Sequence, residues 1–199
     1  MYRKQMTFQK IVCLCVLIAG ALVFIYALGM VTDLYDSLYY TMYDPNDFSM
    51  TDVPGSIIYY DVQDFNHQLL IAALGMIVVS LLLFFTSTNT RRRYYVGNYF
   101  AIGVNAACGI GVTVWALPQI LAFREQYLTT VDFEALKSFS EMWKTLYTES
   151  TFWFDISQAV FGFVILTVVL SIVNLIWKLD MMKTERRLIE AGKRGGAVS

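Results

Sequence analysis

The sequence predicts an all-α membrane protein, a bundle of four transmembrane helices with cytoplasmic N- and C-termini and two medium extracytoplasmic loops. Of its 199 residues, 57% are hydrophobic and only 16% are charged, whereas soluble domains carry about 25% charged residues. Four apolar runs have about the 20 residues that cross a bilayer as a helix. They leave no room for a separate soluble domain of ordinary size, so residues 1–199 are expected to form a single membrane domain.

The first helix is expected over about residues 11–31. Apolar residues continue at helical spacing as far as Met42, so the helix should extend past the bilayer until the sequence Asp-Pro-Asn-Asp at 44–47 ends it. A cleaved signal peptide is the alternative, because basic residues precede the run. The apolar region of a signal peptide is only about 7–15 residues long, so we favour an uncleaved membrane helix.

The second helix is expected over about residues 68–88, with Asp64 or Asn66 as its N-cap. A short strand or an extended segment is expected just before it, at 56–62, within the first exterior loop. The remaining boundaries follow from the apolar runs and turn signals: exterior loop 32–67, third helix 94–121, exterior loop 122–152, fourth helix 153–178 and cytoplasmic tail 179–199.

The second exterior loop is expected to contain an amphipathic helix. Between residues 132 and 147, apolar side chains recur at spacings of three and four, and charged residues occupy the opposite face. This helix should lie on the outer membrane surface or cap the bundle. Its apolar face would comprise Phe133, Leu136, Phe139, Met142, Trp143 and Leu146.

Lysine and arginine are distributed unevenly between the two predicted sides. The N-terminus, the turn before residue 94 and the tail, counted from Lys178, hold twelve of them against three acids, a net charge of +9. The other side, which comprises the two exterior loops and Asp155 at the start of the fourth helix, holds three against thirteen acids, a net charge of −10. Because Lys and Arg are enriched in cytoplasmic loops, both termini are expected inside. The basic residues expected to face anionic lipid headgroups are Arg91, Arg92, Arg93, Lys183, Arg186 and Arg187.

The third helix carries small residues at every fourth position on two flanks. Such residues let membrane helices approach closely, so two close neighbours are expected. Asn98 and Asn105 share a face of this helix, and Asn174 and Thr167 lie at matching depths on the fourth helix. We expect these polar residues to form interhelical hydrogen bonds; lining a polar path is the alternative. The candidate packing and partner residues are Gly97, Asn98, Ala101, Gly103, Asn105, Ala107, Gly109, Gly111 and Asn174.

The first exterior loop is rich in tyrosine and carries seven aspartates, counting Asp33. Aromatic rings beside carboxylates attract cations, including Lys or Arg of a partner, although an aromatic belt with an acidic rim would have the same composition. The candidate exterior recognition residues are Tyr35, Tyr39, Tyr40, Tyr43, Tyr59, Tyr60, Asp61 and Asp64.

Catalysis, cofactor binding and metal binding find little support in the sequence. The apolar runs contain no charged residue and no histidine, and all three cysteines lie within predicted helices. We therefore expect no catalytic residues, no cofactor, no metal and no nucleic-acid partner. An enzyme would have to use groups at the outer rim, such as His67, Asp61 and Asp155.

The leading hypothesis is a non-catalytic accessory or assembly subunit of a larger membrane complex, such as a transporter or a cell-envelope assembly. It would contact membrane lipids and bind other integral membrane subunits through helix three and the Tyr/Asp-rich loop. Assembly into a homo-oligomer is a further possibility. The alternative is a small self-associating channel or carrier with a neutral, Asn-lined path. Exterior loops without cysteine or an Asn-x-Ser/Thr sequon favour the plasma (inner) membrane of a bacterium.

Overall fold

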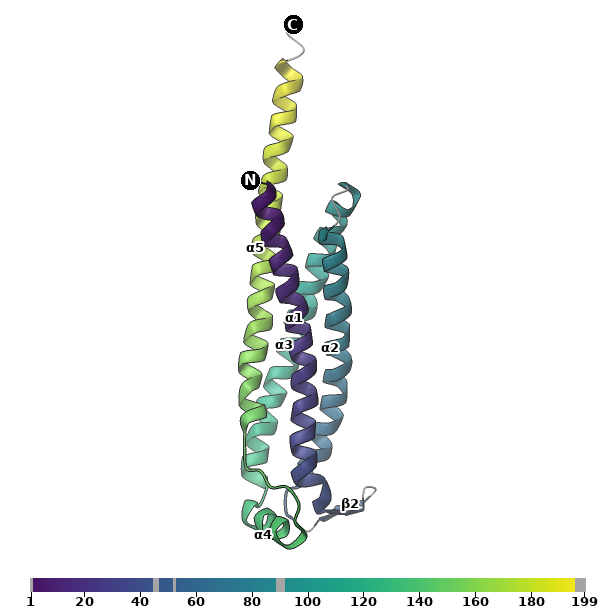
Figure 1. The fold of residues 1–199 in the computed structure, drawn as a ribbon, viewed down its shortest axis with the longest axis vertical. Helices are drawn as coiled ribbons and strands as arrows, with labels where there is room; N and C mark the ends of the chain where they lie inside the picture. Colours follow the sequence, from purple (N-terminus) through teal and green to yellow (C-terminus); the bar gives the residue numbers. More distant parts are fainter. Residues whose placement is uncertain (1, 45–46, 52, 89–91, 196–199) are drawn as a thin grey trace.

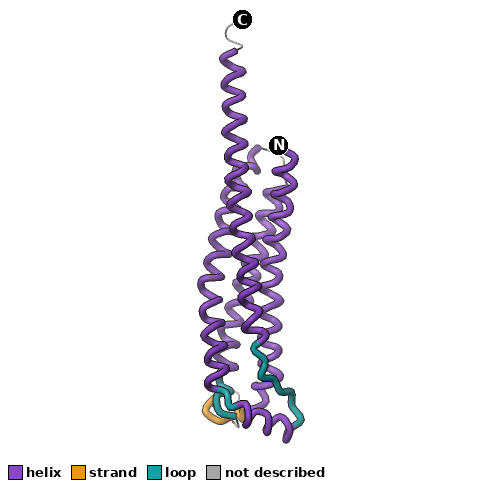
Figure 2. The backbone as a smooth tube through the Cα atoms, turned by 90° about the vertical axis from the view of Figure 1, so that its left-hand side faces the viewer, coloured by secondary structure: helices purple, strands orange, loops and turns teal. Residues whose placement is uncertain are grey.

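Four long helices lie side by side along one axis (Figures 1 and 2). The computed structural model describes residues 2–44, 47–51, 53–88 and 92–195, with side chains at 3–41, 53–87 and 98–191. Each long helix has the length and apolar character to cross a membrane, so the chain has the architecture of a multi-pass membrane protein. These helices are α1 (Tyr2–Leu38), α2 (Ile58–Thr88), α3 (Arg92–Thr130) and α5 (Phe152–Gly195).

The helices form a closed ring of contacts, in which α1 and α3 each pack against both α2 and α5. The N- and C-termini lie at the same end of the bundle, which we call the tail end (Figure 1). The opposite end, the loop end, carries the connections between α1 and α2 and between α3 and α5. Beyond the start of α1, the last part of α5 continues alone.

The connection between α1 and α2 differs from the prediction. A 3-10 turn, η1 (Tyr39–Thr41), leads into an antiparallel hairpin of β1 (Met42–Asp44) and β2 (Asp47–Thr51). The strand predicted at 56–62 is wrong, because α2 already begins at Ile58. Asp64 and Asn66 therefore lie inside α2 and do not cap it. The helix starts early because a turn at Gly55 (φ +83°) lets the Ile58 N–H donate to the Gly55 carbonyl at 3.3 Å.

All four long helices extend beyond their predicted membrane segments. Helix α3, expected to end at 121, continues to Thr130, because Tyr127 still faces the core and is fully buried. Helix α5 runs through most of the predicted tail to Gly195. The hydrophobic runs mark the segments that are apolar enough to cross a membrane. Core packing accounts for the extension of α3, whereas the end of α5 continues without packing against the bundle.

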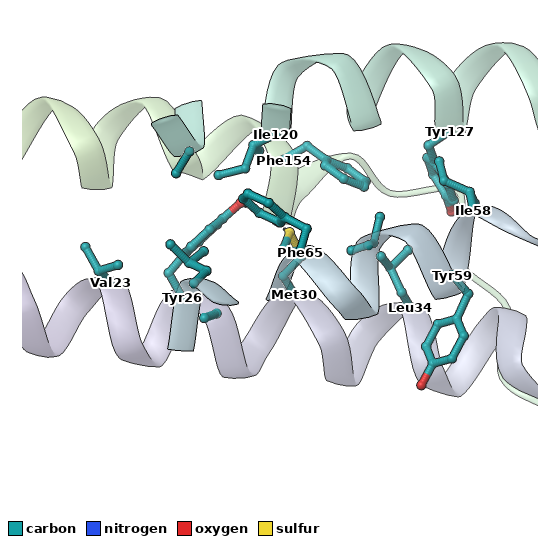
Figure 3. Close-up of a cluster of buried hydrophobic side chains, with 14 of the residues drawn as sticks. Val23, Tyr26, Met30, Leu34, Ile58, Tyr59, Phe65, Ile120, Tyr127 and Phe154 are labelled. Carbon is teal, nitrogen blue, oxygen red and sulfur yellow. Dashed lines mark hydrogen bonds between the residues drawn. The ribbon is translucent and has the colours of Figure 1, made fainter. Parts of the chain in front are cut away.

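The main core occupies the loop-end half of the bundle (Figure 3). Tyr26 and Met30 of α1 pack with Phe161 and Phe154 of α5, and the Tyr26 and Phe161 rings lie 6.2 Å apart, edge to face. Phe65 of α2 contacts aromatic rings on α3. Aromatic residues bury large areas each, so this half of the bundle is held by ring packing.

The amphipathic helix α4 (Phe133–Trp143) caps the loop end, one of its two predicted positions. Leu136 is fully buried in the main core, whereas Met142 and Trp143 are exposed. Asp132 is the N-cap and accepts from the backbone N–H groups of the next turn at 3.1 and 3.0 Å. The Asp132 N–H itself donates to the Pro54 carbonyl at 3.1 Å. This bond joins the two loops to one another.

Position 29 of α1 has room only for glycine, because Trp153 of α5 packs directly against it. A Cβ atom at this position would overlap the indole ring of Trp153. We therefore expect Gly29→Ala to lower the free energy of unfolding by about 1–3 kcal/mol, the usual cost of overpacking, as measured by thermal denaturation in detergent. Gly162→Ala, where a Cβ would meet open space, is the control and should change stability little. Equal effects of the two substitutions would contradict this explanation.

Candidate functional site

Asn98 of α3 lies at the centre of a buried polar cluster at the tail end. Its side-chain oxygen accepts from the ammonium group of Lys178 on α5 at 2.7 Å. Its amide nitrogen donates to the hydroxyls of Ser87 and Thr86 on α2, at 2.8 and 3.1 Å. Both Asn98 and Lys178 are 0% exposed. A single asparagine thus joins three helices through hydrogen bonds.

Two glutamines bring α1 into the same end of the bundle. Gln5 donates to the side-chain oxygens of Asn174 on α5 at 3.0 Å and of Gln9 at 3.1 Å. Gln9 donates to the Ser87 carbonyl at 3.2 Å, and the Cys13 thiol donates to the Ser87 hydroxyl at 3.1 Å. Ser87 therefore forms hydrogen bonds both with side chains of α1 and with Asn98.

The hydrogen bonds of this cluster agree only partly with the residue pairs that matching membrane depths suggest. Asn174 bonds to Gln5 and not to Asn98, whose α5 partner is Lys178. Gln5, Gln9 and Lys178 were not among the predicted residues, because each lies outside an uncharged apolar run. The available signal was the lysine directly after Trp177, one helical turn beyond Asn174. Apart from the bond between Gln5 and Gln9 within α1, the bonds of the cluster join different helices, as expected for polar residues in a membrane bundle.

Asn105 occupies a different setting, in the middle of the bundle. It is 7% exposed, and the structure gives it no hydrogen bond to any described residue. It lines a cavity of about 10 Å³ together with Thr167 and residues from all four long helices. Such a volume is at the lower limit for one water molecule. The predicted proximity of Asn105 and Thr167 is therefore found, but without a direct bond between them.

The two small-residue flanks of α3 have different surroundings. Gly109 faces α5, where a Cβ atom would come within 2.9 Å of Val168, and Ala101 packs against the tail-end apolar cluster. On the other flank, a Cβ atom at Gly103 or Gly111 would meet nothing within 4 Å, and Ala107 is exposed. Helix α3 thus has the two neighbours expected from the sequence, α2 and α5, but neither they nor any other described part of the chain packs against this second flank. Gly97 is described only as part of the α3 backbone.

The predicted exterior tyrosines gather at the loop end, where α1, η1 and α2 meet. The rings of Tyr35 and Tyr39 are stacked with centroids 4.6 Å apart, and Tyr40, Tyr59 and Tyr60 adjoin them. Asp61 and Asp64 are exposed on α2. Tyr43 is described only as part of the β1 backbone.

The outer-rim groups that an enzyme would need are not brought together. Asp155 accepts from the Arg124 guanidinium and from the Thr151 hydroxyl, both at 2.6 Å, and no hydrogen bond links it to His67 or Asp61. Among the described residues, no group of three or more His, Cys, Asp or Glu side chains is placed to hold a metal ion.

The predicted basic surface is described only in part. Lys183, Arg186 and Arg187 are exposed on the portion of α5 that extends past the bundle. Arg92 and Arg93 are seen only as the backbone at the start of α3, and Arg91 lies outside the described residues.

No family model, characterised protein or solved structure matches this chain. The function has to be inferred from the polar clusters and the exposed faces themselves.

Proposed function

We propose that the protein is a non-catalytic accessory subunit of a larger membrane complex and that it binds another membrane helix through the open face of α3. In this proposal the loop end is extracytoplasmic and the tail end, with its lysines and arginines, is cytoplasmic, as the positive-inside rule predicts. Loops without cysteine or glycosylation sequons support the plasma membrane of a bacterium as its location.

One observation carries the proposal. The open face of α3 consists of Gly103, Ala107 and Gly111, with Phe100 (77% exposed) and Val114 (68% exposed) on either side. Steps of three and four residues place all of them on one side of the helix. Packing among the described residues does not use the small residues of this face, whereas a second helix gains close backbone contact from them.

The same contacts give less support to the channel alternative. The side chains of Asn98 and Asn174 form hydrogen bonds between helices. The cavity beside Asn105 has a volume of only about 10 Å³. A continuous path would need wider polar space through the bundle. Solute flux through proteoliposomes of the pure protein would overturn the accessory-subunit proposal in favour of the channel.

Replacing Gly103 by leucine is expected to abolish partner binding while leaving the fold intact. The leucine side chain would occupy the surface that the partner helix must approach. Recovery of the partner in native purification and mass spectrometry should fall about tenfold or more, which corresponds to about 1.4 kcal/mol, at an unchanged melting temperature.

Two controls separate this effect from a general one. Gly75→Leu on α2 places the same side chain where a Cβ atom also meets open space, and it should leave partner recovery unchanged. Gly109→Leu should instead destabilise the bundle, because Val168 and Val164 already fill that space. Recovery of only a lone monomer from the wild-type protein in several mild detergents would refute the proposal.

A further inference from the structure

The tyrosine cluster at the loop end has a buried base and an exposed rim. We define it as Tyr35, Tyr39, Tyr40, Tyr59 and Tyr60. Tyr59 is 3% exposed, whereas Tyr35 is 37% and Tyr40 is 56% exposed. The rings of Tyr35 and Tyr40 meet edge to face at 6.0 Å. Contacts within the cluster hold these two rings in place, so they present a fixed aromatic surface.

Two carboxylates accompany the rings. Asp36 directly follows Tyr35 near the end of α1 and is close enough to interact electrostatically with it. Asp33 precedes Tyr35 by two residues, about 200° away around the helix, and interacts with Asp36 and with the buried Tyr127. Both carboxylates are half-buried, and neither forms an ion pair with a described residue. Arg124, one of three basic residues in the two predicted exterior loops, is already paired with Asp155 at 2.6 Å.

This combination has a defined chemical preference. The face of an aromatic ring carries partial negative charge and attracts cations within about 6 Å. Carboxylates beside the ring add to that attraction and place the same surface at a negative potential. A scattered aromatic belt would not require the five rings to contact one another beside Asp36.

We infer that the tyrosine cluster, with Asp36 beside its exposed ring and Asp33 adding negative charge nearby, binds a lysine or arginine side chain from an extracytoplasmic segment of the partner membrane protein. The inference rests on the proposed function, because it is the partner that supplies the cation. A lipid ammonium headgroup fits less well, since the phosphate attached to every choline or ethanolamine would face the two carboxylates. A basic side chain brings no such anion.

The test uses the pure full-length protein in a non-ionic maltoside detergent and a fluorescent peptide of alternating glycine and arginine as the probe. Fluorescence anisotropy gives its dissociation constant. The joint variant Tyr35→Leu, Tyr40→Leu should weaken binding about tenfold, as expected for two partly exposed cation–π contacts. Asp36→Asn should weaken it several-fold, and added salt should reduce wild-type binding.

Matched controls show whether the cluster itself is responsible. Asp64→Asn makes the same change in net charge on exposed α2, and Tyr147→Leu removes a tyrosine in the segment that follows α4; both should leave the dissociation constant within about twofold. Unchanged melting temperatures will show that the variants are folded. Equal effects of Asp36→Asn and Asp64→Asn, or none from the tyrosine variant, would overturn the inference.

Two further results separate this site from its alternatives. Loss of peptide binding when the protein is moved into phosphatidylcholine nanodiscs would identify the site as a lipid headgroup site and refute the inference. Gly103→Leu should bind the peptide like the wild type, because the open face of α3 takes no part. Capture of a partner by the wild type and not by Gly103→Leu would leave the proposed function standing even if the peptide does not bind.

Discussion

Replacing Asn98 by leucine is expected to destabilise the protein by about 2–4 kcal/mol. The substitution removes the side-chain oxygen that accepts from the buried Lys178 ammonium at 2.7 Å, and it removes the bonds to Ser87 and Thr86. Hydrogen bonds to charged groups contribute about 1.5–3 kcal/mol, and the loss of the bonds to the two hydroxyls adds to this cost. Denaturation of the purified protein in detergent, followed by circular dichroism, measures the loss.

The double variant Asn98→Leu, Lys178→Met tests the physical cause. Removing both members of a buried polar pair costs far less than removing one, so the second substitution should restore part of the lost stability. Methionine keeps much of the length and volume of the lysine chain. If the double variant is less stable than Asn98→Leu alone, the bond between Asn98 and Lys178 is not the main source of the effect.

Gly55→Ala is expected to have a comparably large effect at the other end of the bundle. Gly55 has φ of +83°, a conformation that costs L-residues about 1–2 kcal/mol. A Cβ atom there would also overlap the carbonyl of Thr130, where α3 ends. Because this neighbour is backbone, relief requires the two loops to separate. We expect a loss of about 3 kcal/mol or more, measured as a fall in melting temperature.

The variant Gly55→Asn separates the cost of the positive φ from the cost of the overlap with Thr130. Asparagine tolerates positive φ better than alanine does, but it carries the same Cβ atom. Similar losses for the two variants would show that the contact with Thr130 dominates, whereas a much smaller loss for asparagine would show that the backbone conformation does. A Gly55→Ala protein as stable as the wild type would contradict both explanations.

The membrane helices could be predicted from the sequence because their signals are local. Each apolar run is continuous and free of charge, and each falls within one helix of the structure. The amphipathic helix α4 was also predictable from three- and four-residue spacing, and Leu136 of its predicted apolar face is buried. Met142, Trp143 and Leu146 were predicted for the same face but are exposed, and Leu146 lies beyond the end of the helix. The placement of both termini at one end agrees with the grouping of the basic segments.

The hairpin and the true start of α2 were not predictable in the same way. Residues 56–62 have an apolar and aromatic composition that suits a strand as well as a helix. The choice follows from the turn at Gly55, whose conformation is fixed by contact with Thr130 and by the bond from Asp132 to Pro54. These partners come from the second loop, far away in the sequence.

The segments long and apolar enough to cross a membrane, the distribution of charge and the small-residue flanks of α3 can all be read from the order of the residues. Which polar groups meet and which flank stays open depend on how the helices pack. Hydrophobicity and length fix a helix in the bilayer, but its rotation about its own axis is set by neighbouring helices. That rotation turns Gly109 toward Val168, directs Asn98 to Lys178, and leaves Gly103 and Gly111 facing outward.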